Sequence, residues 1–129
     1  MHIGLLEDNP AIQDYLQQAL ALNGHCVSIH TFGISLLDAL FAEKLVTASR
    51  PYDMVIIDLN LPGDLSGQDV IVHIRKAIVH DMLPILIVSG AGKSQLEQVQ
   101  NLFPDIAIFQ KPFKFQALLQ MLETIKGRQ

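Results

Sequence analysis

The sequence predicts an α/β fold, in which five strands alternate with five helices around one parallel sheet. Two apolar runs, which end at Asp58 and Ser89, have the composition of parallel strands that are buried on both faces. Between the strand-like runs lie segments of about ten to fifteen residues with apolar positions at helical spacing. Strands and helices that alternate in this way form right-handed βαβ units, which predict a sheet covered by helices.

Length and composition indicate one small domain, residues 1–129. Half of the 129 residues are apolar, which is enough for a sizeable core. The 13 acidic and 9 basic residues give a net charge of −4, and the scattered basic residues form no phosphate-binding stripe, so we expect no direct contact with nucleic acid. No apolar run approaches the roughly 18 residues of a membrane span. A single cysteine, Cys26, is expected in the core and indicates a cytoplasmic protein.

The first half of the chain supplies three strands, expected over 3–6, 26–30 and 54–58. The first helix begins at Pro10 after a cap at Asp8 or Asn9, because a proline at the first helical position loses no hydrogen bond. Asn23 and Gly24 end that helix. The second helix begins at Ser35 and carries apolar residues on one face, namely Leu37, Leu40, Phe41 and Leu45.

The second half supplies two strands, over 85–89 and 106–110, and three helices. Ser66 and Asp69 form a capping box that starts the third helix. The fourth helix is expected over 94–103, and the last begins near Phe115 and is strongly amphipathic. Together the elements predict a doubly wound (βα)5 flavodoxin-like fold, with a five-stranded parallel sheet of order 2-1-3-4-5.

Polar side chains stand at the ends of four of these strands. Glu7 and Asp8 follow the first strand, Asp58 ends the third, Ser89 the fourth, and Lys111 follows the fifth. Ligands of doubly wound sheets bind beyond the carboxyl ends of the strands, so we expect these side chains at one rim. Three close carboxylates raise a pKa or recruit a cation, and oxygen ligands suit Mg²⁺. A carboxylate in such a site can attack a phosphoryl donor and become an aspartyl phosphate.

Each of these residues also has an ordinary structural explanation. Glu7 and Asp8 favour the start of a helix, Asp58 ends a strand, and Lys111 is a typical surface charge. None of these explanations requires all of the residues to meet at one rim, so the coincidence favours a functional site.

Four motifs together resemble the receiver domain of two-component response regulators. They occur in order and at family-like spacings across the whole chain: Glu7-Asp8-Asn9-Pro10, Asp58-Leu59-Asn60-Leu61-Pro62-Gly63, Ser89-Gly90 and Lys111-Pro112-Phe113. The resemblance implies a phosphorelay signalling protein rather than an enzyme, with slow self-dephosphorylation at most. It implies phosphorylation by a sensor histidine kinase or a phosphotransfer protein, and altered binding of an output domain or a downstream protein.

The resemblance assigns the metal site and the phosphoacceptor. Asp58 corresponds to the phosphoacceptor and also to a ligand of Mg²⁺. Asp8 corresponds to a direct metal ligand, the backbone carbonyl of Asn60 to a third ligand, and Glu7 to a ligand that acts through water.

The resemblance also assigns the switch residues. Ser89 corresponds to the hydroxyl that moves toward the phosphoryl group, and Lys111 to the lysine that pairs with phosphate. The bond between Lys111 and Pro112 corresponds to a cis peptide. Ile108 occupies the position of the family's switch aromatic, while Phe109 should point to the opposite face of the sheet.

Two further departures from the family pattern concern the loop and the last helix. Gly67 lies nine positions after Asp58, where the family usually has a glycine eight positions after, so the loop is one residue longer and gains the charge of Asp64. The segment after Phe113 lacks the charge pattern with which one DNA-binding subclass dimerises, so we do not expect that dimer.

Two other functions remain open from the sequence. A receiver-like scaffold that binds partners regardless of phosphorylation is supported by Ile108 and by the longer loop. An aspartyl-nucleophile phosphatase is less favoured, because such enzymes generally carry a second acid two residues beyond the nucleophile, where this chain has Asn60.

Overall fold

The computed structural model describes residues 1–41, 51–79 and 81–128. Five parallel strands form one sheet within these residues, in the predicted order β2-β1-β3-β4-β5. Their bounds are β1 (His2–Leu6), β2 (Cys26–His30), β3 (Met54–Asp58), β4 (Ile85–Ser89) and β5 (Ala107–Gln110). The helices are α1 (Pro10–Leu22), α2 (Gly33–Phe41), α3 (Gly67–Ala77), α4 (Lys93–Leu102) and α5 (Phe115–Gly127).

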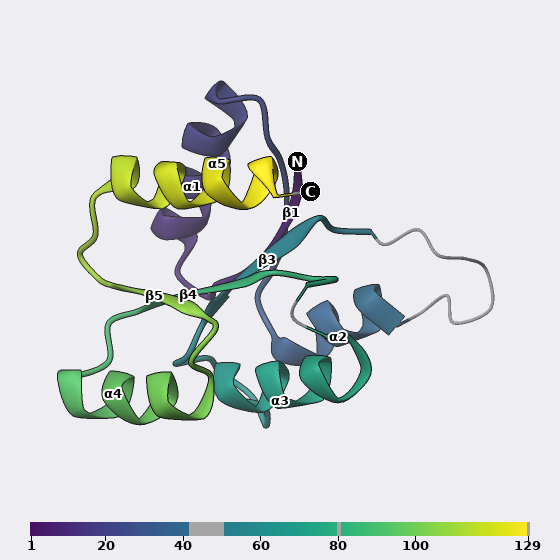
Figure 1. Ribbon diagram of the computed structural model, residues 1–129, viewed down its shortest axis with the longest axis vertical. Helices are drawn as coiled ribbons and strands as arrows, with labels where there is room; N and C mark the ends of the chain where they lie inside the picture. Colours follow the sequence, from purple (N-terminus) through teal and green to yellow (C-terminus); the bar gives the residue numbers. More distant parts are fainter. Residues whose placement is uncertain (42–50, 80, 129) are drawn as a thin grey trace.

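The helices form two layers, with α1 and α5 on one face of the sheet and α2, α3 and α4 on the other (Figure 1). We call these the α1–α5 face and the α2–α4 face. Alternate residues of β3 separate accordingly, because Met54 and Ile56 pack with α1 and α5, whereas Val55 and Ile57 pack with the other three helices. All four side chains are fully buried, which explains why the strand is a continuous apolar run.

The helix starts follow from capping chemistry. The side chain of Asn9 accepts hydrogen bonds from the backbone N–H groups of Ala11 and Ile12, and Pro10 occupies the first helical position. Ser66 and Asp69 make both hydrogen bonds of the predicted capping box. The predicted start of α1 at Pro10 and the predicted capping box of α3 are therefore confirmed, and Asn9 rather than Asp8 caps α1.

Other boundaries differ from the prediction by one or two residues. Helix α2 begins at Gly33 rather than Ser35, whose hydroxyl instead bonds the Nδ1 atom of His30. Helix α4 begins and ends one residue earlier than predicted. The expected contribution of Leu45 to the apolar face of α2 lies outside the described residues.

The expectation that Cys26 packs in the core is wrong. Its side chain is exposed because it opens an edge strand, which has a neighbouring strand on one side only. No described helix is both long enough and apolar enough to cross a bilayer.

Candidate functional site

The acidic residues meet at the carboxyl ends of β1 and β3, which are adjacent in the sheet. Leu6 pairs with Ile57 in the strand register, so the next residues, Glu7 and Asp58, lie side by side. Asp8 joins them, and one carboxylate oxygen from each of the three lies within 4.8 Å of the other two. Parallel strands and the start of α1 thus bring together side chains that are fifty residues apart in the sequence, as the strand-end pattern predicts.

The ammonium of Lys111 reaches this cluster from the loop that follows β5. Its Nζ atom lies 2.6 Å from Glu7 Oε1 and 3.2 Å from Asp58 Oδ2. Burial alone would lower the pKa of Lys111, but its hydrogen bond to Glu7 and the charges of both carboxylates raise it above its ordinary value. Lys111 is therefore a firmly held cation and not a solvated surface charge.

Glu7 is fully buried and is fixed at both carboxylate oxygens. Oε2 accepts hydrogen bonds from the backbone N–H groups of Asp8 and Asn9, while Oε1 accepts from Lys111. The side-chain amide of Gln13 donates to the carbonyl of Glu7 and fixes its backbone as well. Burial raises the pKa of Glu7 to about 7, and the nearby Asp58 adds to the rise while Lys111 opposes it.

The charges of the cluster do not balance. Three carboxylates and one ammonium leave a net charge of −2 when all are ionised, and of −1 when Glu7, whose pKa is raised to about 7, holds a proton; both Glu7 and Asp58 are buried. Carboxylate oxygens are the ligands that Mg²⁺ prefers, and the deficit matches a divalent cation. The residues present therefore fit a magnesium ion, with Asp8 as the exposed carboxylate through which solvent has access.

The loop after Asp58 begins with a hydrogen bond that orients its carboxylate. The backbone N–H of Asn60 donates to Asp58 Oδ1 at 3.1 Å, so the two carboxylate oxygens have different donors. The loop ends at Gly67, whose N–H donates to the carbonyl of Leu59. A β-carbon at Gly67 would lie 2.1 Å from the carbonyl oxygen of Asp58, so only glycine allows this close approach.

The hydroxyl of Ser89 and the side chain of Ile108 lie on the strands beyond β3. Ser89 is fully buried at the end of β4, and its Oγ accepts a hydrogen bond from the N–H of Ala91. Ile108 packs on the α2–α4 face, whereas Phe109 packs on the α1–α5 face. The predicted opposite orientation of Phe109 is therefore confirmed. The Lys111-Pro112 peptide bond is cis, as the resemblance implies.

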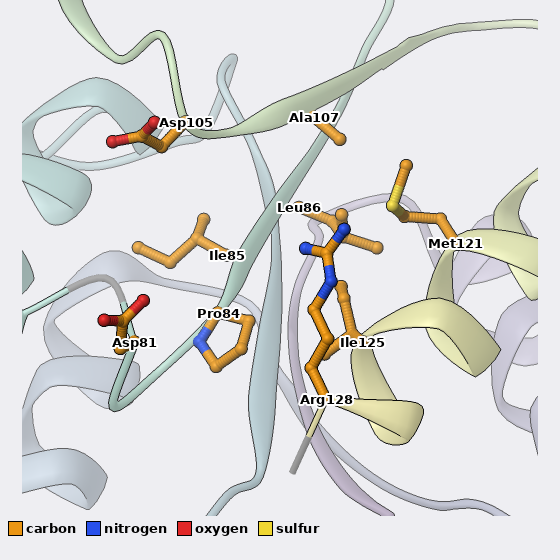
Figure 2. Close-up of a pocket in the computed structure, with 9 residues that line it drawn as sticks. All are labelled: Asp81, Pro84, Ile85, Leu86, Asp105, Ala107, Met121, Ile125 and Arg128. Carbon is orange, nitrogen blue, oxygen red and sulfur yellow. The ribbon is translucent and has the colours of Figure 1, made fainter.

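A cavity of about 240 Å³ lies at the other end of the sheet, around the first residues of β4 and β5. Figure 2 shows the guanidinium of Arg128 beside Leu86, with Asp81 and Asp105 across the strand. Since the strands are parallel, this end is opposite to the rim that carries Asp58. The cavity is therefore separate from the acidic site.

Comparison with known proteins identifies the family to which this chain belongs. The family described as "Response regulator receiver domain" matches residues 3–123, which include all of the acidic cluster and Lys111. The chain belongs to the response regulator receiver domain family. Phosphorylation-dependent switching is the function expected of this family, whose receiver domains are generally signalling modules without enzymatic activity.

Relatives of this receiver domain include two curated regulators. It is 30% identical over 120 residues to response regulator protein FleR of Pseudomonas aeruginosa, which covers 92% of this chain and 23% of that protein. It is also 30% identical over 128 residues to transcriptional regulatory protein QseB of Escherichia coli O157:H7, covering 99% and 54% respectively. The chain thus spans about a quarter to about half of the length of these curated relatives.

Solved structures agree with the fold. A CheY-like receiver domain from Methylobacillus flagellatus superposes with a TM-score of 0.72 at 28% identity, covering 97% of this chain and 98% of that one. The N-terminal receiver domain of RstA from Klebsiella pneumoniae gives a TM-score of 0.79 at 18% identity, covering 96% and 97%.

Two residues of the site could not be identified from the sequence. Gln13 bonds the backbone of Glu7, and Gln110 bonds the backbone of Ala91 next to Ser89. Glutamines on a helix and at the end of a strand carry no distinctive pattern, so only their position close to the strand-end motifs offered a signal.

Proposed function

We propose that Asp58 accepts a phosphoryl group from a phosphohistidine on a sensor histidine kinase or a phosphotransfer protein. The observation that carries the proposal is the contact of Lys111 with both Glu7 and Asp58 in a cluster that also includes Asp8. An ammonium held among three carboxylates provides a site for a phosphoryl group and a metal together.

We assign the magnesium ligands to the carboxylates of Asp8 and Asp58 and to the backbone carbonyl of Asn60, with Glu7 acting through water. The close approach of the carboxylate oxygens and the uncompensated negative charge support this assignment. Bound Mg²⁺ would neutralise negative charge on the phosphoryl oxygens.

In the transfer, an oxygen of the Asp58 carboxylate forms a bond to phosphorus. The bond between phosphorus and the donor's imidazole nitrogen breaks, and its electron pair stays on that nitrogen. Lys111 lies within 3.2 Å of Asp58 and can pair with a phosphoryl oxygen as charge develops there. The Ser89 hydroxyl accepts a bond from Ala91, which does not use its own hydrogen, so it can donate to a second phosphoryl oxygen.

The added phosphoryl group would shift the protein between two conformations that differ in affinity for an output domain or a downstream protein. Lys111 and Ser89 respond first, because each gains a new hydrogen-bond acceptor. A receiver-like scaffold without phosphorylation is the second candidate. It is favoured by the apolar packing of Ile108, a residue with no aromatic ring to reorient.

Intact mass spectrometry after incubation with Mg²⁺ and a small acyl phosphate tests the proposal. We expect the wild-type protein to gain one phosphoryl group, and the Asp58→Asn variant to gain none. The matched control is Asp64→Asn, which removes an exposed carboxylate from the same loop and should leave the gain intact. A wild-type protein that gains no phosphoryl group from either an acyl phosphate or a phosphohistidine protein would support the scaffold instead.

A further inference from the structure

The segment from Ser89 to Ala91 is attached to the end of β5 at two points. The backbone N–H of Lys111 donates to the carbonyl of Ser89 at 2.7 Å, and the side-chain amide of Gln110 donates to the carbonyl of Ala91 at 3.2 Å. The N–H of Ala91 in turn donates to Ser89 Oγ at 3.1 Å. A hydrogen-bonded path therefore leads from the Gln110 side chain, through the backbone of Ala91, to the Ser89 hydroxyl.

The backbone of this segment has few intrinsic restraints. Gly90 and Gly92 flank Ala91, and a β-carbon at either glycine would meet nothing within 4 Å. Glycines in open surroundings reach more backbone conformations than other residues. The direction of the Ala91 N–H therefore depends on its bond to Ser89, on the buried Ala91 side chain and on the amide of Gln110.

The strand register places Gln110 directly beside Ser89, because the two residues pair across β4 and β5. Ile108 lies two residues earlier on β5 and packs within the apolar core of the α2–α4 face. Its side chain has no polar atom with which to bond a hydroxyl. Gln110 is thus the β5 side chain that has a polar connection to the Ser89 segment.

We propose that Gln110 is a positioning residue that orients the Ser89 hydroxyl through the backbone of Ala91. The inference rests on the proposed function, because the orientation of Ser89 affects the reaction only when Asp58 receives a phosphoryl group. A hydroxyl oxygen that accepts from a fixed N–H has its hydrogen directed elsewhere. Ser89 is buried at the end of β4, the strand that pairs with β3 and hence with Asp58. The hydroxyl hydrogen is thereby left free to be donated to another acceptor, such as a phosphoryl group on Asp58.

Amide hydrogen exchange in the unphosphorylated protein tests whether Gln110 holds the backbone of Ala91 in place. Replacing Gln110 by leucine removes the donor and keeps a side chain of similar size. We expect the amide hydrogen of Ala91 to exchange about threefold to tenfold faster in Gln110→Leu, the scale of one hydrogen bond. The control is Gln100→Leu, which removes amide bonds to the carbonyls of Phe103 and Ile106 at the other end of α4. Unchanged exchange at Ala91 in Gln110→Leu would overturn the inference.

A double-mutant comparison tests whether Gln110 affects the phosphorylation of Asp58 through Ser89. Rates of Asp58 phosphorylation by an acyl phosphate with Mg²⁺ are measured for the wild type, Gln110→Leu, Ser89→Ala and the double variant. We expect Gln110→Leu to slow the wild-type reaction about threefold to tenfold and to have no further effect in the Ser89→Ala background. Equal slowing in both backgrounds would overturn the role through Ser89.

The two measurements separate the inference from the proposed function. Failure of the wild-type protein to become phosphorylated contradicts the proposed function, and the exchange of Ala91 still decides whether Gln110 fixes this segment. A wild-type protein that is phosphorylated normally, together with an unaffected Gln110→Leu variant, contradicts the inference alone. Urea unfolding of each variant shows whether faster exchange or slower phosphorylation comes instead from a general loss of stability. Gln100→Leu would share such a general effect.

Discussion

The ammonium of Lys111 lies closer to Glu7 than to Asp58, at 2.6 Å from Glu7 Oε1 against 3.2 Å from Asp58 Oδ2. The resting protein therefore holds its cation mainly on a buried carboxylate that is not the proposed phosphoacceptor. A phosphoryl group on Asp58 has to draw Lys111 toward itself against this contact. Glu7 thus keeps Lys111 in place, and its contact with Lys111 has to weaken before the lysine can move toward a phosphoryl group.

Replacing Lys111 by methionine should separate phosphorylation from metal binding. Loss of the ammonium removes a stabilising charge from the transferring group, and we expect phosphorylation of Asp58 to slow on the order of 100-fold. Magnesium should bind more tightly, because the same change leaves the three carboxylates without their cation. Stopped-flow phosphorylation and a metal titration measure the two effects. The exposed Lys114 is the control, and Lys114→Met should change neither. Weaker metal binding in Lys111→Met would contradict this electrostatic account.

Asp8→Asn should weaken magnesium binding with little effect on the fold. Asp8 is exposed and contributes one oxygen to the cluster, so its replacement removes a ligand without opening a cavity. We expect magnesium affinity to fall about 100-fold or more, because losing a residue that only supports a metal ligand already costs about tenfold to 100-fold. Isothermal titration calorimetry measures the affinity, and urea unfolding should give a free energy within about 0.5 kcal/mol of the wild type. Asp14→Asn, an exposed carboxylate on α1, is the matched control. Undiminished affinity in Asp8→Asn would place the metal elsewhere.

Gly67→Ala should disturb Asp58 through its backbone. The added β-carbon would lie 2.1 Å from the carbonyl oxygen of Asp58 and 2.6 Å from Cα of Leu59, so the backbone of one element has to move. We expect a loss of about 1–3 kcal/mol in the free energy of unfolding, as for other overpacked sites. Phosphorylation should slow as well, because the shift moves the phosphoacceptor. Gly127→Ala is the control, since a β-carbon there meets nothing within 4 Å. A fully stable Gly67→Ala variant would mean that this loop adapts without cost.

Acid should destabilise the protein partly through His30. Burial lowers the pKa of His30, whose ring bonds the hydroxyls of Ser35 and Tyr52. The unfolded chain therefore binds a proton more readily than the folded one, so this contribution to stability is complete above about pH 6.5 and is lost as the pH falls below it. Urea unfolding at pH 7.5 and at progressively lower pH should show that acid lowers the free energy of unfolding less in His30→Gln than in the wild type. His73→Gln, at an exposed histidine, should behave like the wild type. An identical pH slope in His30→Gln would show that its protonation is not linked to folding.

The strand-end motifs were predictable because they follow from parallel-sheet geometry. A continuous apolar run such as 54–57 must be buried on both faces, and the carboxyl ends of parallel strands must meet at one edge. Asp58 and Lys111 could therefore be placed together before their contact was known, although they are 53 residues apart. The same reasoning failed for Cys26: the predicted order already places its strand at the edge of the sheet, but an apolar residue type does not show how far the neighbouring elements cover a side chain there.

The sequence alone determined the order of the strands, the start of α1 at Pro10, the capping box of α3 at Ser66, and the residue types that gather at the acidic rim. These features depend on local capping chemistry and on patterns of burial, and both can be inferred from the order of residue types in the sequence. Only the tertiary structure decided that Lys111 rests on Glu7, and that Gln110 connects to Ser89 through Ala91. Such contacts depend on differences of a few tenths of an ångström in the distances between groups that are far apart in the sequence, and hydrogen bonding discriminates at that scale whereas sequence patterns do not.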